Sequence, residues 1–213
     1  MNKKIEVLGI GHNTPVFMDL ALDCGFEIES LHHYNGGRTG ESIHGYPIVG
    51  SFDDLFSGDL AGRNFLLTMG DISIREELTR KILERGGLLP NLISPLAKIA
   101  RWSKIGDHGI LIFNFSFVQT ETEIKPNTVI LAQSNVAHNC VIDEYCFLST
   151  KVGIGAYTHL HKGVFVGQGA LSISGKVSDI GENAYIGARA LVTKNVPAGA
   201  VMAGIPAKEI KKQ

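Results

Sequence analysis

The second half of the chain places an aliphatic residue at every sixth position. The series runs through Ile112, Val118, Ile124, Ile130, Val136, Ile142, Leu148, Ile154, Leu160 and Val166. After a two-residue insertion the pattern resumes at Ile180, Ile186 and Val192. A short fixed period of this kind is typical of solenoids, in which stacked coils bury one continuous core. The pattern therefore predicts a β-solenoid over this part of the chain.

The fourth residue after each aliphatic position is almost always small or β-branched. These positions hold Ser116, Thr122, Thr128, Ser134, Cys140, Cys146, Val152, Thr158, Val164, Ala170, Ala184, Ala190 and Val196. Alternate residues of a strand face opposite sides, so each hexad is expected to send one large and one small side chain into a narrow core. The spacing does not determine handedness, and the usual crossover rule favours a right-handed coil. The segment from Gly204 to Lys208 follows the last coil and is expected to cover its open end.

The first half of the chain alternates expected strands and helices. Strands are expected over residues 5–10, 26–34 and 64–69, and helices from Thr14 to about Leu22 and from Gly70-Asp71 to Gly86-Gly87. Thr14 is a good N-cap and Pro15 a good first helical residue. The alternation predicts a small parallel α/β sheet of Rossmann-like type, with ligand-binding loops at its carboxyl edge. We place the two domains at residues 1–88 and 89–213.

The turn Gly9-Ile10-Gly11-His12-Asn13 joins the first strand to the first helix. It lacks the third glycine of the dinucleotide fingerprint. Backbone N–H groups at the start of a helix can still bind an anion without a charged side chain, so the turn is a candidate phosphate site. The alternative is an ordinary tight turn between a strand and a helix.

The charge balance narrows the choice of partners. The formal net charge is -1, and no run of Lys or Arg is present, so neither nucleic acid nor an anionic membrane is an expected partner. No stretch approaches 18 apolar residues, and the N-terminus lacks the features of a signal peptide, so we expect a soluble cytoplasmic protein. The three cysteines have no metal or redox spacing, and no disulfide is expected.

Three of the eight histidines stand out by position. His138 is the second residue after Val136, which puts it at a corner of a coil with its side chain directed outward. His159 and His161 flank Leu160 on an outward-facing strand. No third ligand with suitable spacing accompanies them, so we predict no metal site there but a solvated or trimer-interface pair.

Together these residues resemble the hexapeptide-repeat acyltransferases. Within them the similarity is to bacterial nucleotide-sugar 4-amino N-acetyltransferases of the bacillosamine and perosamine pathways, with sialic acid O-acetyltransferases as relatives. It covers nearly the whole chain and rests on the Gly9 turn, Gly45-Tyr46-Pro47-Ile48-Val49-Gly50 with Asp53-Asp54-Leu55, Gly70-Asp71 with Arg75, Gly109-Ile110-Leu111-Ile112, His138-Asn139-Cys140 and Gly204-Ile205-Pro206-Ala207-Lys208. The resemblance implies a left-handed parallel β-helix and a homotrimer with coenzyme A between neighbouring subunits.

The resemblance also implies catalytic roles. His138 would be the general base that takes a proton from the sugar amine as it attacks the acetyl thioester. The next residue is commonly Asp or Glu in the family and is Asn139 here, which can hydrogen-bond but cannot supply negative charge. A second family histidine, near the thioester, corresponds to Phe147. The group that polarises the thioester carbonyl corresponds to the backbone N–H of Ala156.

Binding residues follow from the same resemblance. Acetyl-CoA, as co-substrate, would lie near Ala156, Gly167, Gln168 and Ala188, with its adenine near Pro206 and Lys208. The nucleotide would contact Gly9, Gly11, His12, Asn13, His32, His33, Met69 and Gly70. The family has acidic residues where His32 and His33 stand, so the base is left open among UDP, GDP and dTDP.

The expected function is acetyl-CoA-dependent N-acetylation of the 4-amino group of a nucleotide-linked 4-amino-4,6-dideoxy sugar, with no metal. O-acetylation of a sialic-acid-like sugar is the alternative reaction. A non-catalytic solenoid scaffold is an alternative of a different class, against which His138 at the matching corner argues.

Overall fold

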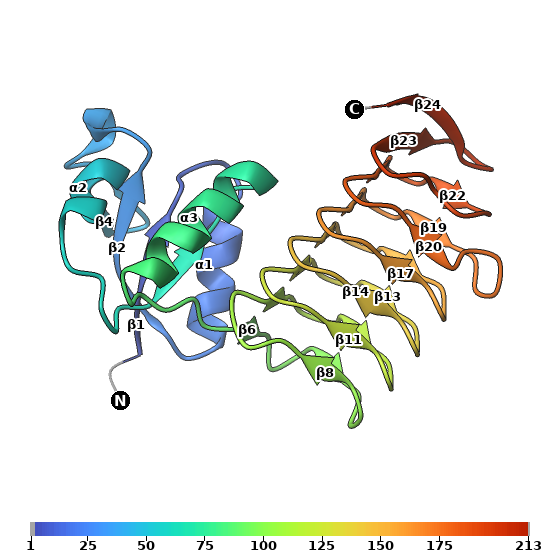
Figure 1. The fold of residues 1–213 in the computed structure, drawn as a ribbon. Coiled ribbons are helices and arrows are strands. Elements are labelled where there is room, and N and C mark those ends of the chain that lie inside the picture. Colours follow the sequence, from blue (N-terminus) through green and yellow to red (C-terminus); the bar gives the residue numbers. More distant parts are fainter. Residues whose placement is uncertain (1–2, 213) are drawn as a thin grey trace. The chain divides into compact units, whose positions relative to one another are not determined.

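A computed structural model describes residues 3–212 of the chain (Figure 1). The chain divides into two compact units, Met1–Leu92 and Ile93–Gln213. The sequence pattern places the domain boundary after residue 88. No helix within the described residues is long and apolar enough to cross a membrane.

The first unit is built on a five-stranded sheet in the order β3-β4-β2-β1-β5. Its strands are β1 (Lys4–Leu8), β2 (Glu27–His33), β3 (Ser42–Ile43), β4 (Tyr46–Ser51) and β5 (Phe65–Leu67). All neighbours pair in parallel except β3, which is antiparallel to β4. The helical segments are α1 (Thr14–Asp23), η1 (Gly36–Arg38), α2 (Phe52–Ser57) and α3 (Ile72–Glu84). The expected α/β unit is confirmed, as a mixed sheet.

The predicted start of α3 is confirmed, whereas the predicted cap of α1 is not. The Asp71 carboxylate accepts the Ile74 N–H at 3.0 Å and caps α3. The prediction that Thr14 caps α1 is wrong, because α1 already includes Thr14 and its N-cap is Asn13, without a side-chain bond. The Thr14 hydroxyl instead turns back and accepts the Gly11 N–H at 2.9 Å. Thr14 therefore holds the preceding turn in place.

The second unit consists of short parallel strands in three sheets, which form the predicted β-helix. The first sheet contains β7 (Lys98–Ile99), β10 (Phe117–Val118), β13 (Asn135–Val136), β16 (Gly153–Ile154), β19 (Leu171–Ser172) and β22 (Leu191–Val192). The second contains β8 (Lys104–Ile105), β11 (Glu123–Ile124), β14 (Val141–Ile142), β17 (His159–Leu160) and β20 (Asp179–Ile180). The third contains β6 (Leu92–Ile93), β9 (Leu111–Ile112), β12 (Val129–Ile130), β15 (Phe147–Leu148), β18 (Phe165–Val166), β21 (Tyr185–Ile186), β23 (Ala200–Ala203) and β24 (Lys208–Lys212).

Every aliphatic residue of the predicted series is buried, and so is every small residue of the companion series. Val136 pairs with Val118 of the preceding coil and Ile154 of the following one, so identical positions stack 18 residues apart. Between the large and the small inward residue, most hexads have one corner residue with a positive φ, such as Asn139 at 57°. This left-handed conformation turns the chain at the corner, so that the large inward residue before it and the small inward residue after it both reach the core.

The β-helix begins one coil earlier than the unbroken series. Ile93, Ile99 and Ile105 already occupy the inward position, and they pack against the same core. A one-residue insertion separates Ile105 from Ile112 and hides this coil from a strict six-residue period. At the other end, Ser172 fills the inward position that the aliphatic series skips.

The C-terminal segment closes the β-helix as a hairpin. β24 runs antiparallel to β23 and ends the third sheet (Figure 1). Ala207 is buried in the core, and its N–H donates to the Leu191 carbonyl at 2.8 Å. The segment from Gly204 to Lys208 thus does not simply cover the last coil but leads into β24, which extends the sheet by one strand.

Candidate active site

His138 and Ala156 stand on one corner of the β-helix, in consecutive coils. His138 is the second residue after β13, Ala156 the second after β16, and Ser174 the second after β19. The register of these strands stacks the three positions. A cavity of about 340 Å³ opens beside this corner; its lining includes Gln119, Asn135, His138, Ala156, Leu171 and Ser174. Its volume lies in the range of small-molecule sites.

Asn139 orients the half-buried imidazole of His138. The Nδ1 atom of His138 lies 2.8 Å from Oδ1 of Asn139. An amide oxygen can only accept, so Nδ1 carries the proton, and Nε2 of the neutral ring is left as the acceptor. The ring of Tyr157 meets the imidazole edge to face, with centroids 5.2 Å apart. The imidazole is therefore held in the tautomer that a proton acceptor at Nε2 requires.

A third residue, Glu121, which no sequence motif indicated, completes this arrangement. The Nδ2 atom of Asn139 donates to Oε2 of Glu121 at 2.8 Å. Glu121 is exposed and lies 18 residues before Asn139, so it occupies the same corner one coil earlier. The separation of 18 residues, which is one coil of the β-helix, is the sequence feature from which this contact could have been predicted.

The expected carbonyl-polarising amide has a partner within the chain. The Ala156 N–H donates to the Ser174 hydroxyl at 2.9 Å. A β-carbon on Gly155 would lie 2.5 Å from the backbone nitrogen of Ser174, so only glycine allows this close approach. The loop that follows β19 is consequently pressed against the corner at Ala156.

The other expected coenzyme A residues lie on a different corner. Gln168 follows β18 and Ala188 follows β21, both in the third sheet, and both side chains are exposed. Gly167 is buried, and a β-carbon there would lie 2.6 Å from the backbone nitrogen of Ala188, so only glycine fits at this position. Pro206 and Lys208 are exposed in the closing hairpin.

The outward face of the third sheet is aromatic. Phe147 stacks on Phe165 at 5.6 Å between ring centroids, and Phe165 stacks on Tyr185 at 4.6 Å. Phe147, at the position of the second family histidine, is thus one member of an aromatic row. It carries no group that can donate a proton or a hydrogen bond to a thioester.

In the first unit, the expected nucleotide residues lie where neighbouring parallel strands end. The residues concerned are Gly9, Gly11, His12 and Asn13 after β1, His32 and His33 at the end of β2, and Met69 and Gly70 after β5. A β-carbon on Gly9, whose φ is 88°, would lie 2.7 Å from Cε of Met69. The hydroxyls of Thr14 and Thr68 lie 3.1 Å apart and both contact the Gly9 carbonyl, which fixes the turn.

The two neighbouring histidines do not form one site. His32 is buried, and its Nε2 donates to Glu6 at 2.8 Å, while Arg63 binds the same carboxylate. Burial tends to raise the pKa of Glu6, but the hydrogen bonds from His32 and Arg63 outweigh it and hold that pKa below its usual range. His33 instead turns to Asn35, with Nδ1 3.2 Å from the backbone oxygen. Nδ1 of His32 is buried without a hydrogen-bond partner among the described residues.

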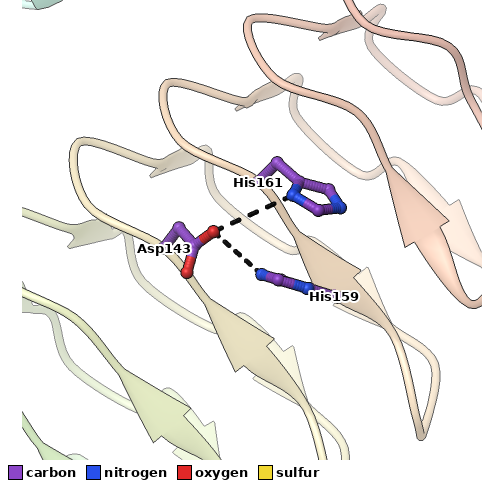
Figure 2. Close-up of side chains that lie close together, drawn as sticks. All are labelled: Asp143, His159 and His161. Carbon is purple, nitrogen blue, oxygen red and sulfur yellow. Dashed lines mark hydrogen bonds and ion pairs between the residues drawn. The ribbon is translucent and has the colours of Figure 1, made fainter.

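The pair His159 and His161 has a third potential ligand beside it, Asp143. The prediction from sequence spacing that no third ligand accompanies the pair is therefore wrong. Figure 2 shows Oδ2 of Asp143 facing both rings, 2.8 Å from Nε2 of His159 and 4.0 Å from Nδ1 of His161. The three donor atoms lie within 4.8 Å of one another, as metal ligands would. However, the Lys125 ammonium lies 2.6 Å from the other oxygen of Asp143, and a cation there opposes a second cation. The donor set fits an ion-pair cluster better than a metal centre.

Asp143 is the anion of this cluster. Burial tends to raise its pKa, but hydrogen bonds from Lys125 and His159 outweigh burial, so the pKa lies below its usual range. His161 also reaches Asp179, with Nε2 3.3 Å from Oδ1. The cluster lies on the second sheet and the His138 corner follows the first, so the two are separate features.

Comparison with known proteins agrees with this architecture. No protein-family model matches the chain. A UDP-3-O-acylglucosamine N-acyltransferase from Wolinella succinogenes is 35% identical over 92 residues, which is 43% of this chain but only 28% of that protein. The chain thus spans little more than a quarter of that relative. A GDP-perosamine N-acetyltransferase from Escherichia coli O157:H7 is 27% identical over 193 residues, 89% of this chain and 86% of that protein.

Two solved structures match nearly the whole chain. The acetyltransferase domain of PglB from Neisseria gonorrhoeae, in complex with acetyl coenzyme A, has a TM-score of 0.88 at 26% identity and covers 99% of this chain and 100% of its own. PerB from Caulobacter crescentus, in complex with CoA and GDP-perosamine, shares the fold with a TM-score of 0.88 at 23% identity, over 98% and 97% of the two chains. The six-residue period and the three-sheet β-helix thus accompany a similarity, over both units and nearly the whole chain, to these nucleotide-sugar acetyltransferases.

Proposed function

We propose that the protein transfers an acetyl group from acetyl-CoA to the 4-amino group of a nucleotide-linked 4-amino-4,6-dideoxy sugar, with His138 as general base. The observation that carries this proposal is the hydrogen bond from His138 to Asn139, which leaves Nε2 as a proton acceptor beside the cavity that Ala156 also lines. An imidazole can accept a proton near neutral pH, as such a base must.

The reaction needs a base, a hydrogen-bond donor for the negative charge that develops on the carbonyl oxygen, and a proton for the leaving thiolate. The sugar amine attacks the thioester carbonyl, and His138 takes a proton from the nitrogen as the C–N bond forms. The carbonyl oxygen becomes an oxyanion, for which the amide of Ala156 on the same corner is the candidate donor once its hydrogen bond to Ser174 opens. When the C–S bond breaks, imidazolium can return the proton to the thiolate of coenzyme A. Atoms and charge then balance without a metal.

Acetyl-CoA would be shared between two subunits of a homotrimer. The reacting corner carries His138 and Ala156, whereas Gly167, Gln168, Ala188, Pro206 and Lys208 lie on another corner or in the hairpin. Two corners of one coil do not face each other, but corners of neighbouring subunits can. The Neisseria relative binds acetyl coenzyme A and the Caulobacter relative binds CoA, which supports this assignment.

The nucleotide would bind at the carboxyl edge of the N-terminal sheet. The exposed residues Gly11, His12, Asn13 and Gly70 would contact it, and the amides of the Gly9 turn would face its phosphates. His33 would contact it from the end of β2, while His32, already paired with Glu6, could offer only Nδ1. The Caulobacter protein binds GDP-perosamine, which makes a GDP-linked amino sugar the first substrate to test.

An acetyl-transfer assay tests this function. Release of the coenzyme A thiol is followed with GDP-, UDP- and dTDP-linked 4-amino-4,6-dideoxy sugars, and with a sialic acid as the hydroxyl acceptor. We expect turnover with at least one amino sugar and loss of that turnover in His138→Ala. Turnover with the sialic acid alone would replace the proposal by O-acetylation, and no turnover with any acceptor would favour a scaffold.

A further inference from the structure

We propose that Glu121 is a positioning residue that sets the protonation of His138 through Asn139. This inference rests on the proposed role of His138 as general base. Two hydrogen bonds carry it, from His138 Nδ1 to Asn139 Oδ1 at 2.8 Å and from Asn139 Nδ2 to Glu121 Oε2 at 2.8 Å. The three groups therefore form one chain from a carboxylate to the imidazole.

The β-helix aligns this chain. Glu121 and Asn139 are both the third residue after a strand of the first sheet, β10 and β13, which pair in register. Both have a positive φ, 56° for Glu121 and 57° for Asn139, so their side chains leave equivalent corners in adjacent coils. Asn is among the residues that adopt this conformation most readily. The corner thus favours Asn139 while placing a carboxylate one coil away.

The carboxylate decides which way the Asn139 amide points. A carboxylate only accepts hydrogen bonds, so the amide must turn its NH₂ toward Glu121 and its oxygen toward His138. The opposite orientation would set the amide oxygen against the carboxylate. Because the amide oxygen also only accepts, His138 must carry its proton on Nδ1. Glu121 thereby selects the tautomer of a residue that it does not touch.

Orientation outweighs charge in this arrangement. Glu121 is exposed, so water and salt screen its field at the imidazole. Tyr157, a titratable residue of the next coil, meets the ring edge to face. Removal of the Glu121 charge alone should therefore matter less than removal of its acceptor atoms.

The same geometry makes Asn139→Asp unfavourable on its own. In that variant a second carboxylate would stand at the 2.8 Å contact with Glu121, and two like charges at that distance repel. Pairing Asn139→Asp with Glu121→Gln removes the repulsion, because the Gln amide can donate to the new carboxylate. The double variant would then have the acidic neighbour that the family commonly places beside the histidine.

The test compares Glu121→Gln, Glu121→Ala, Asn139→Asp and the double variant Glu121→Gln/Asn139→Asp. Glu182→Ala is the matched control, an exposed corner glutamate of the second sheet. We expect Glu121→Ala to lower kcat by roughly 10-fold, a part of the roughly 100-fold contribution of a positioned base, with an unchanged KM for acetyl-CoA. Glu121→Gln should lose less. Asn139→Asp should lose activity that the double variant regains.

The pH profile and the tautomer separate positioning from mere stabilisation. Loss of the acceptor weakens the stabilisation of imidazolium, so the rising limb of kcat should shift to lower pH in Glu121→Ala. ¹⁵N NMR should show His138 protonated at Nδ1 in the parent protein and a mixture of tautomers in Glu121→Ala. A Glu121→Ala variant with the profile and tautomer of Glu182→Ala would overturn the inference. Full activity of His138→Ala would overturn the proposed base instead, and the NMR result would still report on the chain of hydrogen bonds.

Discussion

Ser174 holds the backbone amide of Ala156, whose N–H donates to the Ser174 hydroxyl at 2.9 Å across one coil. The amide expected to polarise the thioester is thus occupied until this exposed hydroxyl rotates away. Ser174→Ala would free the amide at once. Since a neutral hydrogen bond contributes about 1 kcal/mol, we expect KM for acetyl-CoA to fall by roughly fivefold with kcat unchanged or raised.

Lys176→Ala, an exposed change in the same loop, is the control for this measurement. A fall in kcat of Ser174→Ala would mean that the hydroxyl itself donates to the substrate. In that case Ser174 takes the role assigned to the amide.

His138→Ala should separate catalysis from folding and binding. The half-buried imidazole lies at a corner outside the core, so the melting temperature and coenzyme A binding should change little. We expect kcat to fall by roughly 100-fold or more, the usual contribution of positioned proton transfer. Calorimetric titration with coenzyme A and the thiol-release assay measure the two effects, with His108→Ala as the histidine control. Parent-level turnover would rule out the base.

Ile142→Asp should unfold the β-helix, whereas Lys151→Asp should not. Ile142 is fully buried and pairs with Ile124 and Leu160 in adjacent coils. A carboxylate at this position would be buried without a cation or a hydrogen-bond donor, which is strongly destabilising. Lys151 is an exposed corner residue with a φ of 60°, a conformation that Asp tolerates. Thermal denaturation followed by circular dichroism compares them, and equal melting temperatures would contradict the inward register.

Asp143 should make the protein more stable above the pKa of an unfolded Asp, about 3.9, than below it. The pKa of Asp143 in the folded protein is lowered, because the hydrogen bonds from Lys125 and His159 outweigh the effect of burial. Its contribution to stability is therefore full above the unfolded pKa and is lost as the pH falls through the lowered folded pKa. Urea midpoints at pH 7 and pH 3 should therefore differ less in Asp143→Asn than in the parent. Glu182→Gln is the control, and an equal pH dependence in parent and Asp143→Asn would refute this role.

Zinc tests the alternative use of the same cluster. Because the Lys125 ammonium already neutralises Asp143, added Zn²⁺ should leave the melting temperature of the parent unchanged. A rise in the parent that disappears in Asp143→Asn would instead identify Asp143, His159 and His161 as metal ligands.

The aromatic row of Phe147, Phe165 and Tyr185 should contribute to a trimer interface. These side chains stack on an outward face, and burying apolar surface stabilises by about 25 cal/mol per Å². Light scattering should give three times the 23.0 kDa chain mass, and Phe165→Glu should reduce it. A monomer at micromolar concentration would exclude the proposed shared cofactor site.

The β-helix could be predicted because its period is enforced by stacking: each inward position touches the same position 18 residues away, and a charged or unpaired polar group there is costly. The coil at Ile93, Ile99 and Ile105 falls within the expected β-helix domain but outside the unbroken series, because one added residue breaks the period. Residues 36–57 gave no strong period, because β3 is short and exposed and β4 contains Pro47 and Gly50.

The geometry of the candidate site was partly predictable for the same reason. His138 follows from its distance to an inward residue, but Glu121 lies three hexads before Asn139 and forms its bond only when the coils stack. Lys125, Asp143 and His161 likewise occur 18 residues apart, so a search at the coil period would have found the third member of the histidine cluster. The separate orientations of His32 and His33 depend on Glu6 and Asn35, which no period relates to them.

The loop between β19 and β20 shows where this architecture can change its length. Both insertions, before Ile112 and between Ser172 and Ile180, fall at corners, and the strands beyond them return to register. An added residue within a strand would instead turn every later inward side chain outward. A corner loop can therefore lengthen, and with it reshape the cavity beside His138, without a change in the buried aliphatic series. Under the proposed function, selectivity for the acyl donor can then vary independently of stability.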